Sequence, residues 1–262
     1  MLHSSTIDAA LAVGFVEVKS GSTVLLVAVL ALALAAVHVA TPGLVVLESL
    51  PRSPTLSFGS GVSVAYVFVH LFPEVDHASD ALAGGEDALL PFGLPVYAVV
   101  LLGFAGFYGL EQFVRRARAA GQGGPSDDPD GVFWVHVGSF ASYNALLGYL
   151  LAERAGEDPA SVALYAAAIG LHFLVNDHGL RDHHEHLYQR VGRWLLAGSV
   201  VAGGALGLAV HVDALVLDLL VSLLAGSIVL NVIKEELPGD RESRFWAFLV
   251  GAVLYTALLA TI

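Results

Sequence analysis

The chain has 262 residues, of which 56% are hydrophobic and 14% charged, and its mean hydropathy is +0.73. This composition is typical of an integral membrane protein. The net charge of −12 argues against a nucleic-acid partner, and an acidic surface with few lysines is typical of proteins adapted to high salt. Because the chain has no cysteine, disulfides and thiolate chemistry are excluded, and any metal ligand must be imidazole, carboxylate, amide or water.

Eight apolar segments separated by polar breaks predict eight transmembrane helices. A helix needs roughly 20 mostly apolar residues to cross the bilayer, and its backbone groups must bond within the segment. The predicted spans lie near 22–48, 57–74, 94–114, 132–152, 160–178, 194–211, 213–234 and 244–262. The expected fold class is an all-α integral membrane protein, with residues 1–262 forming one polytopic domain. Residues 115–131 are expected to form a flexible cytoplasmic loop.

The distribution of basic residues predicts the orientation of the spans. Lysine and arginine in short loops favour the cytoplasmic side of a membrane. If both termini lie outside, Lys19 and Arg154 are the two basic residues outside, and the other ten of the twelve fall inside. We therefore expect a multi-pass protein of the cell membrane with both termini outside. The first 21 residues show no pattern of a cleaved signal peptide.

A weak internal repeat relates the second and seventh predicted spans. Residues 57–73 align without gaps with residues 222–238. The identical pairs are Ser57/Ser222, Gly61/Gly226, Val67/Val232 and Pro73/Pro238. The two spans are predicted to run in opposite directions, which is typical of inverted-repeat transporters with a binding site near the membrane midplane. The alternative is chance similarity between apolar helices that contain glycine and proline.

Polar side chains inside the predicted spans mark a candidate transport site. The fifth span carries His172 and Asn176 four residues apart, so both lie on one face of a helix. Such groups persist in membranes mostly where they pair, line a pathway or hold an ion. The remaining candidates come from other spans: His136, Asn144 and Glu235 for the transport site, and His70, Glu74 and Glu236 as secondary polar groups.

Each of these candidates has a structural alternative. His172 and Asn176 could form a hydrogen-bonded pair that joins helices. His136 could be a solvated or capping histidine, and the polar residues at span ends could simply be hydrated. His38, alone in an apolar segment, is expected to be a buried histidine with satisfied hydrogen bonds.

A histidine-rich segment follows the fifth predicted span. If the helix continues, His178, Asp182 and His186 lie at i, i+4 and i+8 on one stripe, with His183 and His184 beside it. Neutral imidazole and carboxylate together can bind zinc or another transition metal. The candidate metal ligands are therefore His172, His178, Asp182, His183, His184 and His186. The alternative is a solvated cytoplasmic helix.

The order and content of these segments resemble the ZIP family of divalent-metal transporters. The resemblance rests on residues 61–74, which end in His-Leu-Phe-Pro-Glu, on residues 225–238, which end in Glu-Glu-Leu-Pro, and on residues 168–176 around His172. It implies a bundle of eight spans with both termini outside and a variable loop after the third span. It also implies movement of a divalent cation toward the cytoplasm by alternating access.

The metal-ligand motifs of that family are degenerate in this chain. Its fourth span usually reads His-Asn-x-x-Asp/Glu-Gly, and Ser139, Phe140, Tyr143 and Asn144 stand at the ligand positions here. In the fifth span Asn176 replaces the second ligand, and the sixth span has no carboxylate. We therefore expect a divergent carrier for zinc, iron or manganese rather than an enzyme, with a divalent metal ion, zinc first, as substrate or regulator.

Two other interpretations stay open. A ZIP-like protein that has lost metal transport could act as a sensor or carry a different substrate. A membrane metalloenzyme would hold iron through clustered histidines, and His178-x4-His183-His184 is faintly similar to the histidine boxes of membrane desaturases. The expected partners are the metal ion and the lipid bilayer. Gly203, Gly204 and Gly207 allow close helix contact, either within one protomer or between the two protomers of a homodimer.

Overall fold

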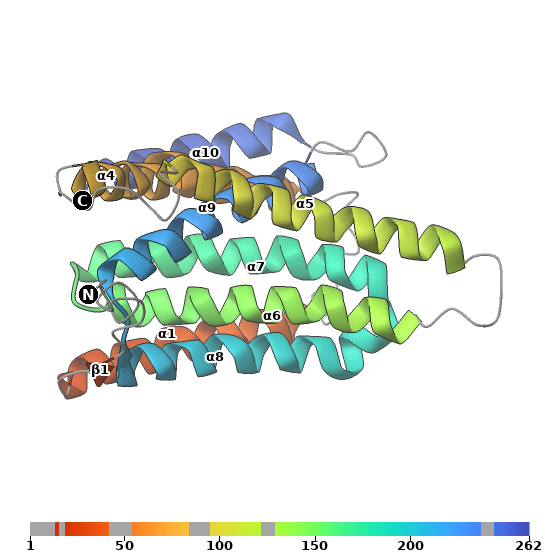
Figure 1. Ribbon diagram of the computed structural model, residues 1–262, viewed down its shortest axis with the longest axis horizontal. Helices are drawn as coiled ribbons and strands as arrows, with labels where there is room; N and C mark the ends of the chain where they lie inside the picture. Colours follow the sequence, from red (N-terminus) through yellow and green to blue (C-terminus); the bar gives the residue numbers. More distant parts are fainter. Residues whose placement is uncertain are drawn as a thin grey trace, which may run out of the picture.

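The protein consists of helices that lie side by side (Figure 1). The computed structural model describes residues 14–15, 19–41, 54–83, 95–121, 129–236 and 244–261. Within these residues, six helical segments are long and apolar enough to cross a membrane. They are Gly21–Ala40, Pro54–His77, Val96–Arg116, Pro159–Arg181, His184–Ala209 and Ala214–Lys234. The chain is therefore an all-α membrane protein, as its composition predicts.

Two π-helical turns, at residues 67–71 and 188–192, join helices that follow one another along the described chain. In chain order the elements are β1 (Gly14–Phe15), α1 (Gly21–Ala40), α3 (Pro54–Tyr66), η2 (Val67–Leu71), α4 (Phe72–Ala83), α5 (Val96–Gly121), α6 (Pro129–Arg154), α7 (Pro159–Leu187), η3 (Tyr188–Gly192), α8 (Arg193–Ala209), β2 (Val210–His211), α9 (Ala214–Glu236) and α10 (Phe245–Leu259). The two short strands pair antiparallel, with Gly14 opposite His211.

Each of the eight predicted spans contains a helix, although the limits differ. The two spans that are not among the six apolar segments correspond to α6, which has 26 residues, and to α10, a shorter apolar helix of 15 residues. In the predicted loop 115–131, α5 continues to Gly121 and α6 begins at Pro129. The part of that loop at 122–128 lies outside the described residues.

Local sequence explains where α7 begins, and a break in its helical geometry lies near its end. The side chain of Asp158 accepts hydrogen bonds from the backbone N–H groups of Ala160 and Ser161, at 2.9 and 3.4 Å, and Pro159 occupies the first turn. An aspartate cap followed by proline is a favoured helix start. At the other end, His184 has non-helical backbone angles (φ −140°, ψ 43°). The chain bends at this residue before it returns along the bundle as α8 (Figure 1).

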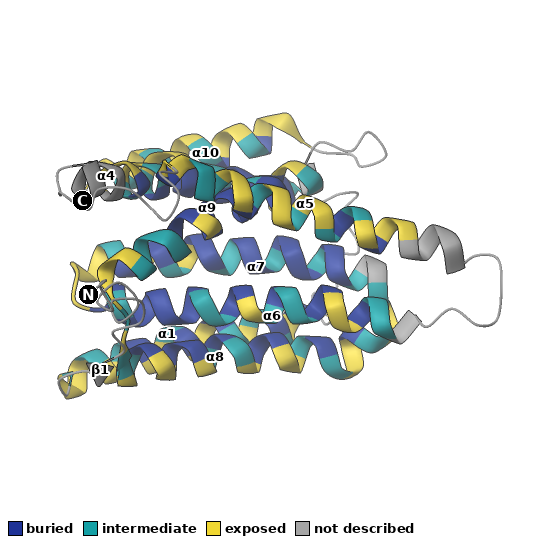
Figure 2. Ribbon diagram, in the orientation of Figure 1, coloured by how far each residue is buried: buried dark blue, intermediate teal, exposed yellow. Residues whose placement is uncertain are grey.

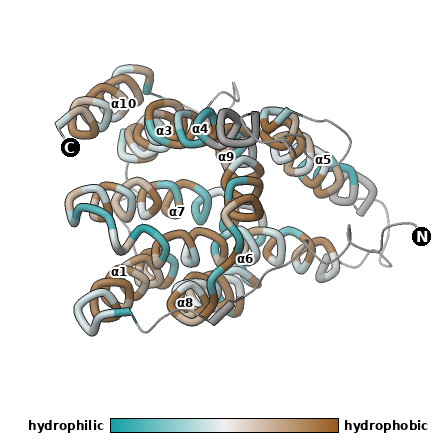
Figure 3. The backbone as a smooth tube through the Cα atoms, turned by 60° about the vertical axis from the view of Figure 1, so that its left-hand side comes forward, coloured by the Kyte–Doolittle hydropathy of each residue, from teal (hydrophilic) through white to brown (hydrophobic). Residues whose placement is uncertain are grey.

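Helix α7 lies in the middle of the bundle. It packs on α3 and on α1, and Figure 3 shows it between a layer that contains α3 and α10 and a layer that contains α1 and α8. Much of α6 and α7 is buried, whereas α1, α5 and α10 expose part of their surface (Figure 2). The exposed side chains include large apolar ones such as Leu25, Leu101 and Trp246. Such an apolar exterior suits a lipid environment.

Helices α3 and α10 meet through a reciprocal pair of glycines. A Cβ atom built on Gly61 would overlap the carbonyl oxygen of Phe248, and one built on Gly251 would overlap that of Phe58. Glycine allows two backbones to approach this closely, and close packing is the main source of helix association in lipid. Both positions therefore require glycine.

Helices α5 and α9 meet in the same way, through Gly103 and Gly226. A Cβ atom on Gly103 would overlap the carbonyl oxygen of Leu223. In the predicted repeat, Phe58 and Gly61 of α3 align with Leu223 and Gly226 of α9. The aligned residues thus make equivalent contacts with different partner helices, which a chance similarity of sequence does not explain.

The two segments of the predicted repeat run in opposite directions. One cavity is lined both by Glu74 and Val75, which lie near the end of the first segment, and by Leu217 and Asp218, which lie near the start of the second. The end of α3–η2–α4 is therefore next to the start of α9. This antiparallel arrangement agrees with the opposite directions predicted for the two spans.

Candidate functional site

Polar side chains gather in the middle of the bundle and toward its two ends. The end at which α3–η2–α4 finishes and α9 begins is called the Glu74 end. The opposite end, where α5 carries Glu111 and α7 reaches His184, is called the Glu111 end.

The middle group contains the His172 and Asn176 pair predicted from the sequence. His172 is buried, and its Nε2 lies 2.8 Å from the hydroxyl of Tyr143 on α6 and 2.9 Å from Nδ2 of Asn176. Its Nδ1 is buried without a hydrogen-bond partner. The four-residue spacing does place His172 and Asn176 on one face, and Tyr143 joins them across the α6–α7 interface.

A second buried group adjoins the first and links three helices. Nδ1 of His38 on α1 lies 2.7 Å from Oδ2 of Asp177 on α7, and Nε2 of the same ring lies 3.0 Å from Nδ2 of Asn144 on α6. The hydroxyl of Thr41 is 3.5 Å from Asp177. His38 is thus buried with satisfied hydrogen bonds, as predicted. Asn144 belongs to this group and makes its contact with His38 rather than with His172.

The Glu111 end brings together two histidines that the sequence analysis assigned to different sites. Nδ1 of His136, proposed for the transport site, lies 3.2 Å from Nε2 of His184, proposed for the histidine-rich cluster. Nε2 of His136 is 4.0 Å from Glu111. Glu111 in turn accepts hydrogen bonds from Lys234 at 3.1 Å and from Arg115 at 3.3 Å. Helices α5, α6, α7 and α9 are therefore tied together at this end.

The predicted stripe of His178, Asp182 and His186 is interrupted. It requires a continuous helix, and the non-helical backbone at His184 separates His186 from the two earlier residues. The i+8 register therefore ends before His186, whose side chain is exposed. The side chains of Asp182 and His183 lie outside what the structure describes, so their part in a metal site stays a prediction.

The same holds for the two glutamates of the seventh predicted span. Glu235 and Glu236 close α9, but their side chains also lie outside the described part of the chain. Among the side chains that are described, no group of three or more histidines, aspartates or glutamates has the arrangement of a metal site. The two buried groups in the middle of the bundle consist of histidine, tyrosine, asparagine and threonine side chains and one aspartate, Asp177, which is paired with His38.

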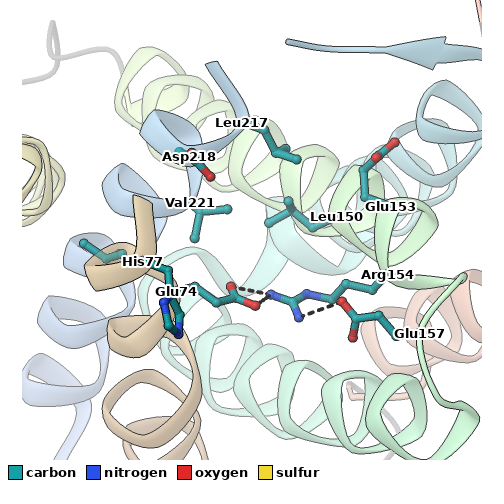
Figure 4. A pocket seen from close by; sticks show the side chains of 10 residues that line it. Glu74, His77, Leu150, Glu153, Arg154, Glu157, Leu217, Asp218 and Val221 are labelled. Atoms are coloured by element: carbon teal, nitrogen blue, oxygen red, sulfur yellow. Dashed lines mark hydrogen bonds and ion pairs between the residues drawn. The ribbon is translucent and has the colours of Figure 1, made fainter. Parts of the chain in front are cut away.

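The Glu74 end contains a cavity of about 490 Å³. Four carboxylates line it, from Glu74, Glu153, Glu157 and Asp218, and the guanidinium of Arg154 lies among them (Figure 4). Two of the three secondary residues of the sequence analysis are here: His70 Nε2 is 2.9 Å from Arg154 Nη1, and Glu74 is 2.5 Å from Arg154 Nη2.

Several residues of these groups were not predicted from the sequence. Asp177 and Glu111 are carboxylates within or beside apolar segments, a signal that could have singled out both residues. Arg154 was counted only as one of two basic residues on the outside. The sequence does not indicate that the side chain of Arg154 turns inward, because its partners His70 and Glu74 lie 84 and 80 positions away in the chain.

Comparison of the chain with protein-family models gives no match, and comparison with curated protein sequences gives none.

Proposed function

We propose that the protein is a ZIP-like secondary carrier that moves a divalent transition-metal cation toward the cytoplasm by alternating access. In this proposal zinc, iron or manganese is the substrate, and eight helices cross the membrane with both termini outside. The observation that carries the proposal is the position of His172. This buried histidine lies in the middle of the bundle, between polar groups at both ends, and its Nδ1 has no hydrogen-bond partner. Because the amide of Asn176 donates to Nε2, the neutral ring carries its proton on Nδ1, and Nδ1 becomes a metal donor when that proton moves to Nε2 and the amide of Asn176 turns its oxygen to accept it.

The cavity at the Glu74 end supports a positively charged substrate. A concave surface lined by one sign of charge raises the local concentration of the opposite ion. Four carboxylates and one guanidinium line this cavity, so the charge balance favours cations. Such a cavity would concentrate metal ions near the start of α7, the helix that carries His172.

The packing of the two repeat segments supports a carrier mechanism. Carriers built from inverted repeats move one half against the other around a site near the midplane. Here α3 and α9 run in opposite directions and contact α10 and α5 through equivalent glycines. His172 lies on α7, which packs on both repeat segments.

The hydroxyl of Tyr143 favours a second candidate, a ZIP-like protein that has lost metal transport and senses a ligand or carries a different substrate. This hydroxyl lies 2.8 Å from Nε2 of His172, at a position where the family resemblance implies a carboxylate. The nearby carboxylate of Asp177 is already paired with His38. Divalent ions are normally held by several donors with net negative charge.

Uptake by proteoliposomes distinguishes the two candidates. The wild-type chain and His172→Ala would be compared for initial uptake of zinc, manganese and ferrous iron, with His211→Ala as the control because that histidine is exposed. We expect uptake of at least one of these ions by the wild type and by the control. Loss of one of the few central donors is expected to lower the rate by about tenfold or more.

Each other outcome has a definite meaning. Equal uptake by the wild type and His172→Ala removes His172 from the transport site. No uptake of any of the three ions by folded wild-type protein favours the second candidate. Two iron ions per purified chain would instead support a metalloenzyme.

A further inference from the structure

Arg154 makes the densest set of polar contacts at the Glu74 end. Its side chain is only 8% exposed. Nη2 contacts both carboxylate oxygens of Glu74 at 2.5 Å, while Nη1 contacts Nε2 of His70 at 2.9 Å and Oε1 of Glu157 at 3.4 Å. Figure 4 shows the guanidinium between the two glutamates. Charge-assisted contacts of this kind are the strong ones among hydrogen bonds.

These contacts join three segments of the bundle. Glu74 lies on α4 and His70 in the π-helical turn η2, Arg154 ends α6, and Glu157 lies in the connection to α7. A π-helical turn within a helix is a frequent feature of functional sites, where it lets the helix adjust. The guanidinium therefore holds the helix that contains η2 against the end of α6 and the connection to α7.

Aromatic rings lie next to the guanidinium. Arg154 stacks over the ring of Tyr165 with 5.3 Å to its centroid. Tyr165 contacts Tyr66 at 5.8 Å, and Tyr66 contacts His70 at 5.4 Å between ring centroids. Both tyrosines are buried. Tyr165 lies on α7 between the start of the helix at the Glu74 end and His172, so this aromatic group stands beside the part of α7 that leads from Arg154 toward His172.

A cation that enters the cavity meets the same carboxylates that hold Arg154. Glu74 and Glu157 each contact the guanidinium and each line the cavity. A divalent ion near Glu74 would compete with Arg154 for that carboxylate, and the buried guanidinium would lose its main partner. Loss of one partner of a buried ion pair is costly because it leaves an unpaired charge in the interior, so the pair favours two discrete states, closed and open.

We propose that Arg154 is the latch that closes the path between the acidic cavity and His172, and that it opens when its ion pair with Glu74 is released. The proposal rests on the proposed function, because a latch has a purpose only if a substrate passes. Closure itself is measured by accessibility and needs no transported ion.

The absence of cysteine in the chain makes a single introduced thiol a clean reporter of accessibility. Ala168 is buried and precedes His172 by one helical turn, on the same face and toward the Glu74 end. The rate at which a cationic methanethiosulfonate labels Ala168→Cys would be measured in purified protein with Arg154, Arg154→Lys and Arg154→Gln. We expect slow labelling with arginine and labelling faster by about tenfold or more with glutamine. Lysine should give an intermediate rate, because an ammonium group makes no bidentate contact.

Two further variants make the result specific. Leu217→Cys lines the cavity wall, so its labelling rates with arginine and glutamine measure the altered attraction of the cationic reagent. The rates of Ala168→Cys are divided by these rates, and the expected acceleration of about tenfold refers to the ratio. Glu74→Gln should accelerate labelling of Ala168→Cys as Arg154→Gln does, and the double variant should add little. If Ala168→Cys does not fold, Ser63→Cys serves as the reporter. Ser63 is buried and follows Gly59, which faces α7, by four residues.

Equal labelling of the buried reporter in the Arg154 and Arg154→Gln backgrounds overturns the latch. Faster labelling with glutamine upholds it, whatever the uptake assay gives. The two proposals can fail independently. If wild-type protein takes up no metal but labelling of Ala168→Cys still accelerates with Arg154→Gln, the transport proposal fails and the latch stands.

Discussion

His38 and Asp177, which are 139 positions apart in the chain, form a buried pair with 2.7 Å between Nδ1 and Oδ2. Their side chains are 1% and 0% exposed. Asp177 directly follows Asn176, but successive residues on a helix point about 100° apart. Asn176 therefore contacts His172 while Asp177 contacts α1, and one turn of α7 serves both central polar groups.

Asp177→Ala is expected to destabilise the protein strongly. The substitution leaves Nδ1 of His38 without its carboxylate partner in the bundle interior. Removing one partner of a buried pair typically costs about 3–5 kcal/mol. Thermal unfolding in detergent, followed by circular dichroism, measures the change. Asp76→Asn is the matched control, because Asp76 is exposed; a midpoint for Asp177→Ala equal to that of this control would contradict the prediction.

Tyr143→Asp is expected to strengthen metal binding in the middle of the bundle. It exchanges the hydroxyl that lies 2.8 Å from His172 for a carboxylate, and added ligand charge favours a divalent ion. A gain in zinc affinity of about tenfold or more is expected by isothermal titration. Tyr143→Phe separates the two effects, because it removes the hydroxyl without adding charge. If the aspartate variant binds zinc no better than the phenylalanine variant, position 143 does not face the metal path.

Gly61→Ala and Gly226→Ala are expected to destabilise the bundle to a similar extent. At each position a Cβ atom would overlap a backbone carbonyl oxygen of the facing helix, and the helices must separate to admit it. Overpacking of this kind costs about 1–3 kcal/mol. Gly138→Ala is the control, since nothing lies within 4 Å of a Cβ atom there. The midpoint of thermal unfolding in detergent is compared for the three variants. If only one of Gly61→Ala and Gly226→Ala lowers this midpoint, the two glycines do not have equivalent roles in the repeat.

The sequence by itself determined that the chain is a membrane protein with all-α structure. The composition carries this information, because each span must be apolar along its whole length and must satisfy its backbone within the helix. For the same reason each predicted span contains a helix, although the limits differ and helices extend into the predicted loop 115–131. The relation of residues 57–73 to residues 222–238 could also be found, although its meaning became clear only from the glycine contacts of α3 and α9.

The local spacing of His172 and Asn176 was a reliable guide as well. Both residues lie on one helix, where a separation of four residues fixes a common face. The same reasoning failed beyond His184, because the backbone there leaves the helical conformation and the spacing no longer describes a stripe.

Only the tertiary structure decided which polar residues meet across helices. His38 with Asp177, His136 with His184, and Arg154 with Glu74 are joined over separations of 139, 48 and 80 positions. Apolar helices have nearly uniform surfaces, so the composition of a span does not say which face turns inward or which neighbour it meets. Helix rotation and packing partners depend on close contacts, such as those of the paired glycines, and these are properties of the assembled bundle.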